Sequence, residues 1–368
     1  GTGMDINIVV EADVSPQEMA EIAVVAERAG IRALWSSNYH QYWDAFISLV
    51  PAALQTSKLI IGPLAVSPWE MHPLKMANAL LTLNEISNGR ALIGVSGGGG
   101  VLGAINWKIA NDAPVWPALD PVKMTRFPNR RVRGVRECLE ILNLARSGKM
   151  STGYEGGVFG VPRPFVMEWA KSAGPLLYGC CNGPQMIAMG ARHADGIQFS
   201  DFTVAMTGPA VAKIRESLSG REEPIDAGGD ERFRIDNFWA WHIKDDRDKA
   251  MYEARRELIW RGAVIGREEH ILRQFLDEDE IQVVLDNWNN FRKASWTRSG
   301  DIDGVPEDIV NRLIAGLASA GDLDDLDAEI ERFRQFRDAG LTELSLRLHD
   351  DPLDALKLIT ERVLPAVQ

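Results

Sequence analysis

A stretch of eight residues, 36–43, carries a titratable imidazole, phenol groups, two amides and an indole. His40 changes protonation near neutral pH, so His40 or its neighbour Tyr39 could exchange a proton with a substrate. Trp43 could form an aromatic wall beside the same substrate. These three side chains are the candidate catalytic residues. A single histidine is more often structural than catalytic, so the alternative is an ordinary loop.

Two glycine-containing segments could hold an anion. Residues 96–100 read Ser-Gly-Gly-Gly-Gly, and residues 181–185 read Cys-Asn-Gly-Pro-Gln. Glycines let backbone N–H groups approach a ligand closely, and clustered N–H groups suit a phosphate. Gly183 also stands at an expected helix start, where the helix dipole favours negative charge. The alternatives are a flexible loop for the first segment and an ordinary turn for the second.

The other histidines give little support to metal or hydrolase chemistry. We expect His72 and His193 to be structural, and His242, at the end of an expected strand, is a weaker candidate. No His-Glu-x-x-His or P-loop pattern occurs in the sequence. We therefore expect no metal in the site.

The overall composition is that of an acidic, water-exposed protein. The 368 residues carry a net charge of −12, which repels nucleic-acid phosphate and argues against nucleic acid as a partner. No apolar run approaches the roughly 20 residues of a membrane span. The three cysteines, Cys138, Cys180 and Cys181, have no metal-binding spacing. We read them as reduced thiols of a cytoplasmic protein.

One basic run stands out in this acidic chain. Arg130, Arg131, Arg133 and Arg136 open an expected helix. The more common interpretation is a solvated helix face. The alternative is a contact for the anionic tail of a cofactor.

Short apolar runs alternate with amphipathic helical patterns along the chain, which predicts a parallel sheet covered by helices. The expected strands are residues 6–10, 31–35, 59–61, 90–95, 176–181, 196–199, 233–243 and 341–346. About eight such units favour a (β/α)₈ TIM barrel. A doubly wound open sheet would fit the same local pattern, but no Gly-x-Gly-x-x-Gly follows the first strand.

Three segments interrupt the alternation of strands and helices. We expect insertions at about 97–128, 148–174 and 264–300, so that extra chain follows strands four and seven of one domain over residues 1–368. The second insertion is expected to hold a short hairpin. Helices are expected from the third insertion on to Gly340. In a barrel, the chemistry lies in the loops after the strands, at the end we call the mouth.

The sequence resembles the bacterial-luciferase-like superfamily. The resemblance is carried by Ile60-Ile61-Gly62, Ser67-Pro68, His72-Pro73, Asn88-Gly89-Arg90 and Gly94 to Gly98, and by residues 178–185 with 194–196. It implies a (β/α)₈ barrel that binds a flavin or deazaflavin at its mouth. The first loop and first helix are more similar to the branch that uses coenzyme F420, which includes methylene-tetrahydromethanopterin reductase. Other branches use FMN.

The resemblance also implies roles for individual residues. Leu64 and Ala65 match a bulge with a non-prolyl cis peptide behind the cofactor ring. The phosphate-bearing tail would lie on Gly97, Gly98, Asn182 and Gly183, and Trp43 matches an active-site tryptophan. Asn38 and Gln185, in the same loops, complete the expected cofactor-binding set.

Two positions depart from the deazaflavin branch. That branch commonly has Asp-His after the second strand, where this chain has Asn38-Tyr39, with His40 one residue later. It often has a glutamate after the glycine loop, where this chain has Gly99. Tyr39 or His40 could replace one half of the acid–base pair, and Glu11 is a more remote candidate for the other half.

Three functions are compatible with these residues. The first is an oxidoreductase that transfers a hydride to or from a small organic substrate with F420 or FMN. The second is an FMN-dependent monooxygenase that uses O2 and flavin reduced by a separate flavin reductase. The third is a non-catalytic barrel that binds a flavin. The resemblance also implies a homodimer.

Overall fold

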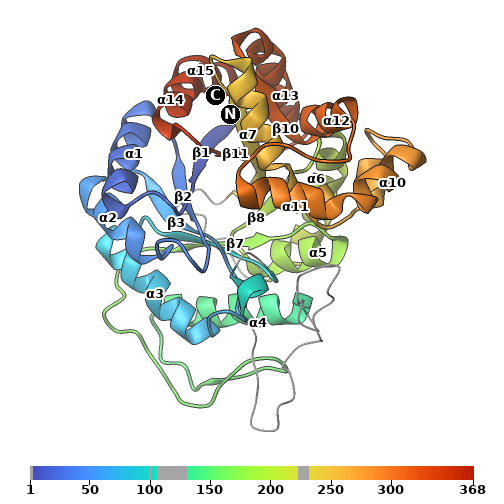
Figure 1. Cartoon of the computed structure of the whole chain (residues 1–368). Helices are drawn as coiled ribbons and strands as arrows, with labels where there is room; N and C mark the ends of the chain where they lie inside the picture. Colours follow the sequence, from blue (N-terminus) through green and yellow to red (C-terminus); the bar gives the residue numbers. More distant parts are fainter. Residues whose placement is uncertain (1–2, 99–100, 106–130, 223–231) are drawn as a thin grey trace. The chain divides into compact units, whose positions relative to one another are not determined.

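The computed structural model describes residues 3–98, 101–105, 131–222 and 232–368. Most of the expected insertion at 97–128 lies outside these residues. Eight parallel strands form the sheet order of a closed barrel, with helices between them (Figure 1). The predicted TIM barrel is therefore confirmed.

The barrel strands match the eight predicted runs with small shifts of their ends, except that the third strand extends to Val66, five residues beyond the predicted end. They are β1 (Asp5–Val10), β2 (Ala33–Ser37), β3 (Ile60–Val66), β4 (Leu92–Val95), β7 (Leu176–Cys180), β8 (Gly196–Ser200), β9 (Arg234–Ile243) and β11 (Glu343–Arg347). The sheet runs β9-β11-β1-β2-β3-β4-β7-β8, and β8 pairs with β9.

The chain divides into two compact units. The N-terminal unit comprises Asn7–Gln198 and Ala210–Asp236, and the C-terminal unit comprises Gly1–Ile6, Phe199–Pro209 and Asn237–Gln368. The helices up to the end of β8 are α1 (Pro16–Ala29), α2 (Val50–Gln55), α3 (Pro73–Ile86), α4 (Arg131–Arg146) and α5 (Pro184–His193).

The N-terminal unit shows why the early units fold as they do. Ser15 caps α1 by accepting a hydrogen bond from the Glu18 amide, and Gly30 ends it in the left-handed conformation that glycine favours. Trp35 and Tyr178 meet edge to face at 5.5 Å between ring centroids. Both side chains are fully buried, so this pair forms part of the core of the unit.

Residues 148–174 contain the expected hairpin. Strands β5 (Tyr154–Glu155) and β6 (Gly160–Val161) pair antiparallel. The turn between them is held by Glu137 of α4, whose carboxylate accepts hydrogen bonds from the amides of Val158 and Phe159. The hairpin is therefore fixed to the helix that precedes it.

Helix α6 (Val204–Leu218) passes from the C-terminal unit into the N-terminal unit. The remaining helices belong to the C-terminal unit. They are α7 (Arg247–Arg256), α8 (Gly262–Ile265), α9 (Glu269–Leu272), α10 (Glu278–Asp286), α11 (Trp288–Thr297), α12 (Glu307–Leu317), α13 (Leu326–Asp338), α14 (Pro352–Leu358) and α15 (Leu364–Val367). A π-helical turn over Ile359–Val363 joins the last two.

The expected third insertion, 264–300, is helical and packed. Trp288 and Phe291 of α11 are buried in one apolar cluster with Leu313 of α12. Asp277 caps the start of α10. Its carboxylate accepts a hydrogen bond from the Glu280 amide, and the Glu280 carboxylate accepts one from the Asp277 amide. These helices therefore have a core of their own.

One element was predicted wrongly. Helices were expected without interruption up to Gly340, but residues Ala318–Gly321 form a strand, β10, parallel to the last four residues of β9. Helix α12 ends at Leu317, and the backbone of the following segment pairs with the backbone of β9 instead. Tertiary pairing, not local propensity, decides this conformation.

Candidate functional site

The two glycine-containing loops lie at the same rim of the barrel. Strands β4 and β7 are parallel neighbours, with Val95 opposite Gly179 at their C-terminal ends. The segment 96–98 and the segment 181–183 therefore leave the sheet side by side. Adjacency of these loops is the condition on which a shared phosphate site depends.

A bulge interrupts β3 at the predicted position. The peptide bond between Leu64 and Ala65 is cis, and the pairing of β3 with β4 shifts register between Leu64 and Val66. Gly94 on β4 lies against this bulge: a Cβ there would come within 2.7 Å of the Leu64 side chain and 3.0 Å of the Cys180 sulfur. The floor of the mouth is therefore tightly packed.

Asn38 fastens the loop after β2 to this bulge. Its Nδ2 donates to the Ala65 carbonyl at 2.9 Å and to Oε2 of Glu70 at 3.1 Å. Asn38 follows Ser37, which pairs with Leu64 in the sheet. Of the predicted cofactor-binding set, Asn38, Leu64 and Ala65 are thus in direct contact or adjacent.

Gly97 leaves room for a cation beside the glycine loop. A Cβ on Gly97 would lie 2.2 Å from Cγ and 2.4 Å from Cδ of Arg131, the first residue of α4. The next arginines of the basic run are used within the helix, since Arg133 pairs with Glu137 and Arg136 with Glu140. Arg130 lies outside the described residues. Arg131 itself is exposed, as the solvated-face interpretation of the run predicts.

The second glycine loop presents the start of α5 to solvent. Gly183 is the N-cap residue, and no side chain caps the helix there. Asn182, Gly183 and Gln185 are all exposed, and a Cβ on Gly183 would meet nothing within 4 Å. A helix start of this kind favours an anionic group.

The predicted catalytic residues lie in a more open loop. His40 and Trp43 are exposed, the latter by 51%. Tyr39 packs edge to face on Tyr42 at 5.8 Å, and the Trp43 amide donates to the carbonyl of Ala12, after β1. The loop is therefore held to its neighbour, and the catalytic roles of these side chains stay predictions. So does the role of Glu11, which is partly buried after β1.

The sequence did not lead us to predict Glu70 as a site residue. It lies three residues after Ser67 in the loop that follows β3, and its Oε1 accepts from the Ser67 amide at 2.8 Å. Burial raises its pKa above 4.5, more than the hydrogen bonds from Ser67 and Asn38 lower it. A carboxylate in a mouth loop is a signal that could have identified it.

The histidine predicted as a weaker candidate lies among paired charges in the C-terminal unit. His242 is buried at the end of β9, with Nδ1 2.8 Å from Oε1 of Glu253, whose Oε2 is 2.9 Å from Lys244 Nζ. Its ring stacks on His349 at 5.1 Å. Burial lowers the pKa of His242 to about 4, so the imidazole is neutral at pH 7. We call His242, Glu253 and Lys244 the buried triad.

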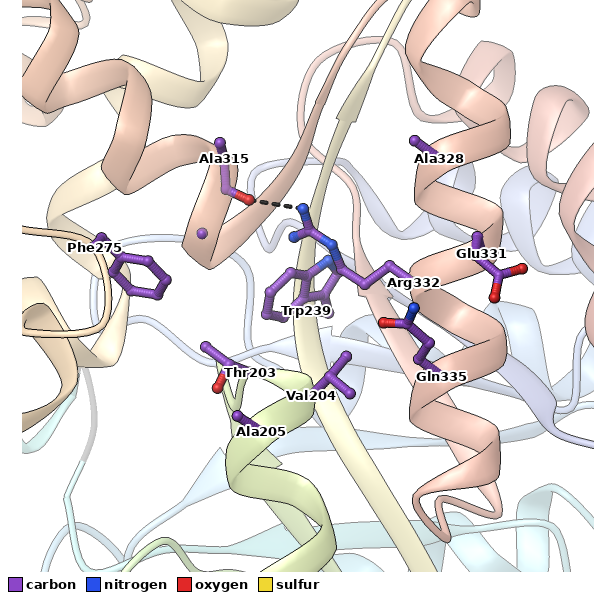
Figure 2. Close-up of a pocket in the computed structure, with 11 residues that line it drawn as sticks. Thr203, Val204, Ala205, Trp239, Phe275, Ala315, Ala328, Glu331, Arg332 and Gln335 are labelled. Atoms are coloured by element: carbon purple, nitrogen blue, oxygen red, sulfur yellow. Dashed lines mark hydrogen bonds between the residues drawn. The ribbon is translucent and has the colours of Figure 1, made fainter.

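A pocket of about 350 Å³ also lies in the C-terminal unit (Figure 2). Its residues include Trp239 of β9, Phe275 and Arg332 of α13. The Arg332 guanidinium lies 5.4 Å from the Trp239 ring and donates to the carbonyls of Ala315 and Ala318. The guanidinium is therefore hydrogen-bonded to carbonyl groups at the C-terminal end of α12. None of the predicted site residues lines this pocket.

His72 has the structural role that was predicted. It is the N-cap of α3, and its Nδ1 accepts a hydrogen bond from the Leu74 amide at 3.1 Å. The cysteines Cys138, Cys180 and Cys181 are free thiols. Within the described ranges, no helix is long and apolar enough to cross a membrane.

Comparison with known proteins finds similarity over nearly the whole chain. Residues 4–343 match the luciferase-like monooxygenase family. The 5,10-methylenetetrahydromethanopterin reductase of Archaeoglobus fulgidus is 25% identical over 99% of this chain and 100% of its own. An F420-dependent glucose-6-phosphate dehydrogenase of Nakamurella multipartita is 24% identical over 82% of this chain and 84% of its own.

Solved structures show the same fold. The coenzyme F420-dependent tetrahydromethanopterin reductase from Methanopyrus kandleri superposes with a TM-score of 0.78 at 24% identity, over the full length of both chains. An F420-dependent secondary alcohol dehydrogenase, in complex with an F420-acetone adduct, gives 0.69 at 17% identity over 100% of this chain and 99% of its own.

The chain belongs to the luciferase-like monooxygenase family. The predicted resemblance, and with it the expectation of an oxidoreductase of this family, is confirmed.

Proposed function

We propose that the protein is an oxidoreductase that binds the deazaflavin F420 at the mouth of its N-terminal unit. When bound, this cofactor supplies hydride-transfer chemistry toward a small organic substrate. The observation that carries the proposal is the adjacency of the two glycine loops at one rim, beside the Leu64–Ala65 bulge. The F420-dependent relatives support the deazaflavin over FMN.

The residues present fit such a cofactor. Gly97 and Gly183 lack side chains where a tail phosphate would approach, and a Cβ on Gly97 would collide with Arg131. Arg131 and the exposed start of α5 supply positive charge for that phosphate. Gly98, Asn182 and Gln185 belong to the same two loops and complete this anion-binding part of the site.

The other residues would position the ring and the substrate. The bulge at Leu64 and Ala65, held by Asn38, offers a packed surface for one face of the ring. Tyr39, His40 and Trp43 lie in the loop after β2, where they would contact the substrate. Fixing two reactants in one orientation is the main contribution that this chain makes to a hydride transfer.

Turnover with F420 tests the proposal. Oxidised F420 is mixed with the protein and with alcohols of increasing size, and bleaching of the visible deazaflavin absorbance is recorded. We expect bleaching with at least one alcohol and reoxidation when the matching carbonyl compound is added. The proposal is wrong if reduced FMN with O2 supports turnover while F420 neither binds nor reacts.

The same experiment separates the remaining functions. Oxygen consumption with reduced FMN would support the monooxygenase, which needs a separate flavin reductase as partner. Binding of a flavin without turnover of any substrate would support the non-catalytic barrel. The homodimer and the cytoplasmic location stay predictions.

A further inference from the structure

The turn that carries Glu70 fixes its carboxyl group. The Glu70 and Met71 amides both donate to the Ser67 carbonyl, and the Trp69 amide donates to the Ser67 hydroxyl. Oε1 of Glu70 in turn accepts from the Ser67 amide. One carboxylate oxygen is therefore occupied by its own turn, and the other points toward Asn38.

Asn38 links that carboxyl group to the bulge. The side-chain amide of Asn38 has two hydrogen-bond partners, the Ala65 carbonyl and the Glu70 carboxylate. Both partners are acceptors. This arrangement determines which amide atom is Nδ2, because only the nitrogen can donate to both. One nitrogen thus bridges the backbone of the bulge and the carboxyl group of Glu70.

No cation neutralises Glu70 among the described residues. Its hydrogen-bonding neighbours are Ser67 of its own turn and Asn38 of the loop after β2, and neither carries charge. Burial therefore dominates and raises the pKa of the carboxyl group above its ordinary 4.5. A carboxyl group shifted toward neutral pH is suited to both giving and taking a proton.

We propose that Glu70 is the acid–base group of the reaction, positioned by Asn38 at the edge of the Leu64–Ala65 bulge. This assignment rests on the proposed function, because it takes the bulge as the place of the deazaflavin ring. It would take over from the acid–base pair whose usual positions are occupied here by Asn38-Tyr39 and Gly99. His40 is exposed, so water competes for its proton.

The proton and the electrons balance for an alcohol substrate. The carbon–hydrogen bond of the alcohol breaks with its electron pair leaving as hydride to the oxidised deazaflavin. The hydroxyl proton passes to the Glu70 carboxylate as the carbonyl forms. The alcohol is oxidised, the deazaflavin is reduced, and Glu70 later releases the proton to water. In the reverse direction, protonated Glu70 donates to the carbonyl oxygen.

The decisive variant is Glu70→Gln, with Glu21→Gln on the exposed face of α1 as a matched control. For the alcohol that the wild type oxidises fastest, we expect kcat of Glu70→Gln to fall by about 100-fold or more. Its Kd for F420, measured by fluorescence quenching, should stay within about twofold, since the tail contacts are unchanged. The control should match the wild type in both measurements.

The pH profile separates an acid–base role from a structural one. Wild-type kcat/KM for alcohol oxidation should rise with pH through an inflection above 4.5, because the carboxylate form is required. Glu70→Gln should lose that inflection. Asn38→Asp should move it to higher pH, because a second carboxylate disfavours ionisation of the first.

A readout without cofactor covers the case of a poorly folding variant. Since the pKa of Glu70 is raised in the folded state, the stability of the wild type should fall as pH rises through the interval above 4.5. Thermal unfolding of Glu70→Gln should lack this contribution. Glu70→Asp, which keeps the carboxyl group but shortens its reach, should retain the pH inflection with a lower kcat.

The outcomes are distinguishable. If the wild type neither binds nor reduces F420, the proposed function fails and the role of Glu70 fails with it. If the wild type binds F420 and oxidises an alcohol, but Glu70→Gln keeps the wild-type rate and pH inflection, only the assignment of Glu70 is overturned. Loss of rate with an unchanged inflection would equally overturn it, since that result marks a structural residue.

Discussion

Two groups of polar residues at strand ends differ in whether their charged groups are paired with opposite charges. In the C-terminal unit, the buried triad after β9 pairs its ionic groups, and Arg256 nearby pairs with Glu257 and Asp350. In the N-terminal unit, Gly183 starts a helix without a side-chain cap, and Glu70 has no cationic partner among the described residues.

This difference distinguishes charged groups that stabilise the fold from groups that are available to bind a ligand. Both regions contain groups with shifted pKa values, so a shift alone does not identify a functional site. Charges that are buried and mutually paired hold the fold, because removing one partner exposes the other to an apolar environment. Exposed backbone donors, and a carboxyl group with no cationic partner among the described residues, differ from such pairs, and a ligand can interact with them.

Breaking the buried triad should produce the largest change in stability. Glu253→Ala leaves Lys244 without its carboxylate partner in the triad and removes the carboxylate from His242, so we expect destabilisation by about 3–4 kcal/mol. Urea unfolding followed by circular dichroism measures this change. The Kd for F420 should stay within about twofold at a temperature where the variant is folded. A large loss of F420 affinity in the folded variant would remove the distinction between the two regions.

A negative charge placed at the start of α5 should cause the next largest change, a loss of affinity for F420. In Gly183→Asp the new side chain has open space and can cap the helix, which stabilises it by about a few tenths of a kcal/mol. The same carboxylate repels a phosphate, so we expect the Kd for F420 to rise by about 100-fold.

Gly183→Asn is the matched control for this substitution. Asparagine caps a helix as well as aspartate does but carries no charge. We expect thermal stability similar to that of Gly183→Asp and an F420 affinity within about fivefold of the wild type. Equal loss of affinity in both variants would show that space, rather than charge, matters at this position.

The buried triad should also make stability depend on pH. His242 binds a proton with a pKa of about 4 when folded and near 6.5 when unfolded, so the unfolded state binds more protons between these values. Stability should therefore be complete above pH 6.5 and fall as the pH drops toward 4, by up to about 1.4 kcal/mol per pH unit.

The carboxylate of the buried triad adds a second step at lower pH. The hydrogen bond and charge of His242, together with Lys244, hold the pKa of Glu253 at about 2 despite its burial. Stability from this group is present above its ordinary 4.5 and is lost as the pH falls toward 2. A pH series of unfolding midpoints checks both steps, and Glu253→Gln should remove the second.

Filling the pocket beside Trp239 should have the smallest effect. Ala328→Leu adds apolar volume on an exposed wall of the pocket, and leucine is nearly as good a helix former as alanine. We expect a change in stability below about 0.5 kcal/mol and an unchanged Kd for F420. A loss of F420 affinity would place the cofactor in the pocket rather than at the glycine loops.

The sequence predicted the elements and loops that local patterns encode. Alternating strands and helices predicted the barrel. Gly97 and Gly183 were predicted as cofactor-binding residues because glycines and helix starts can be recognised in the sequence without knowing which residues they contact. The bulge at Leu64 and Ala65 followed from the family resemblance. Such features depend on a few neighbouring residues or on a shared fold.

The interactions that the sequence did not reveal join distant residues. Glu70 meets Asn38 across 32 positions, and the Arg131 side chain lies beside Gly97, 34 positions earlier in the sequence. The strand β10 pairs with the last four residues of β9, a partner that its own residues, Ala318 to Gly321, do not encode. Side-chain partners and edge pairing are decided by tertiary structure.

A calorimetric titration of F420 into the cofactor-free wild type and Gly183→Asp tests the central claim most directly. We predict one F420 bound per chain, with a Kd of about 1 µM or tighter for the wild type and about 100-fold weaker binding for the variant. Absence of binding to the wild type, or equal affinity in the two proteins, would contradict the location of the cofactor at the two glycine loops.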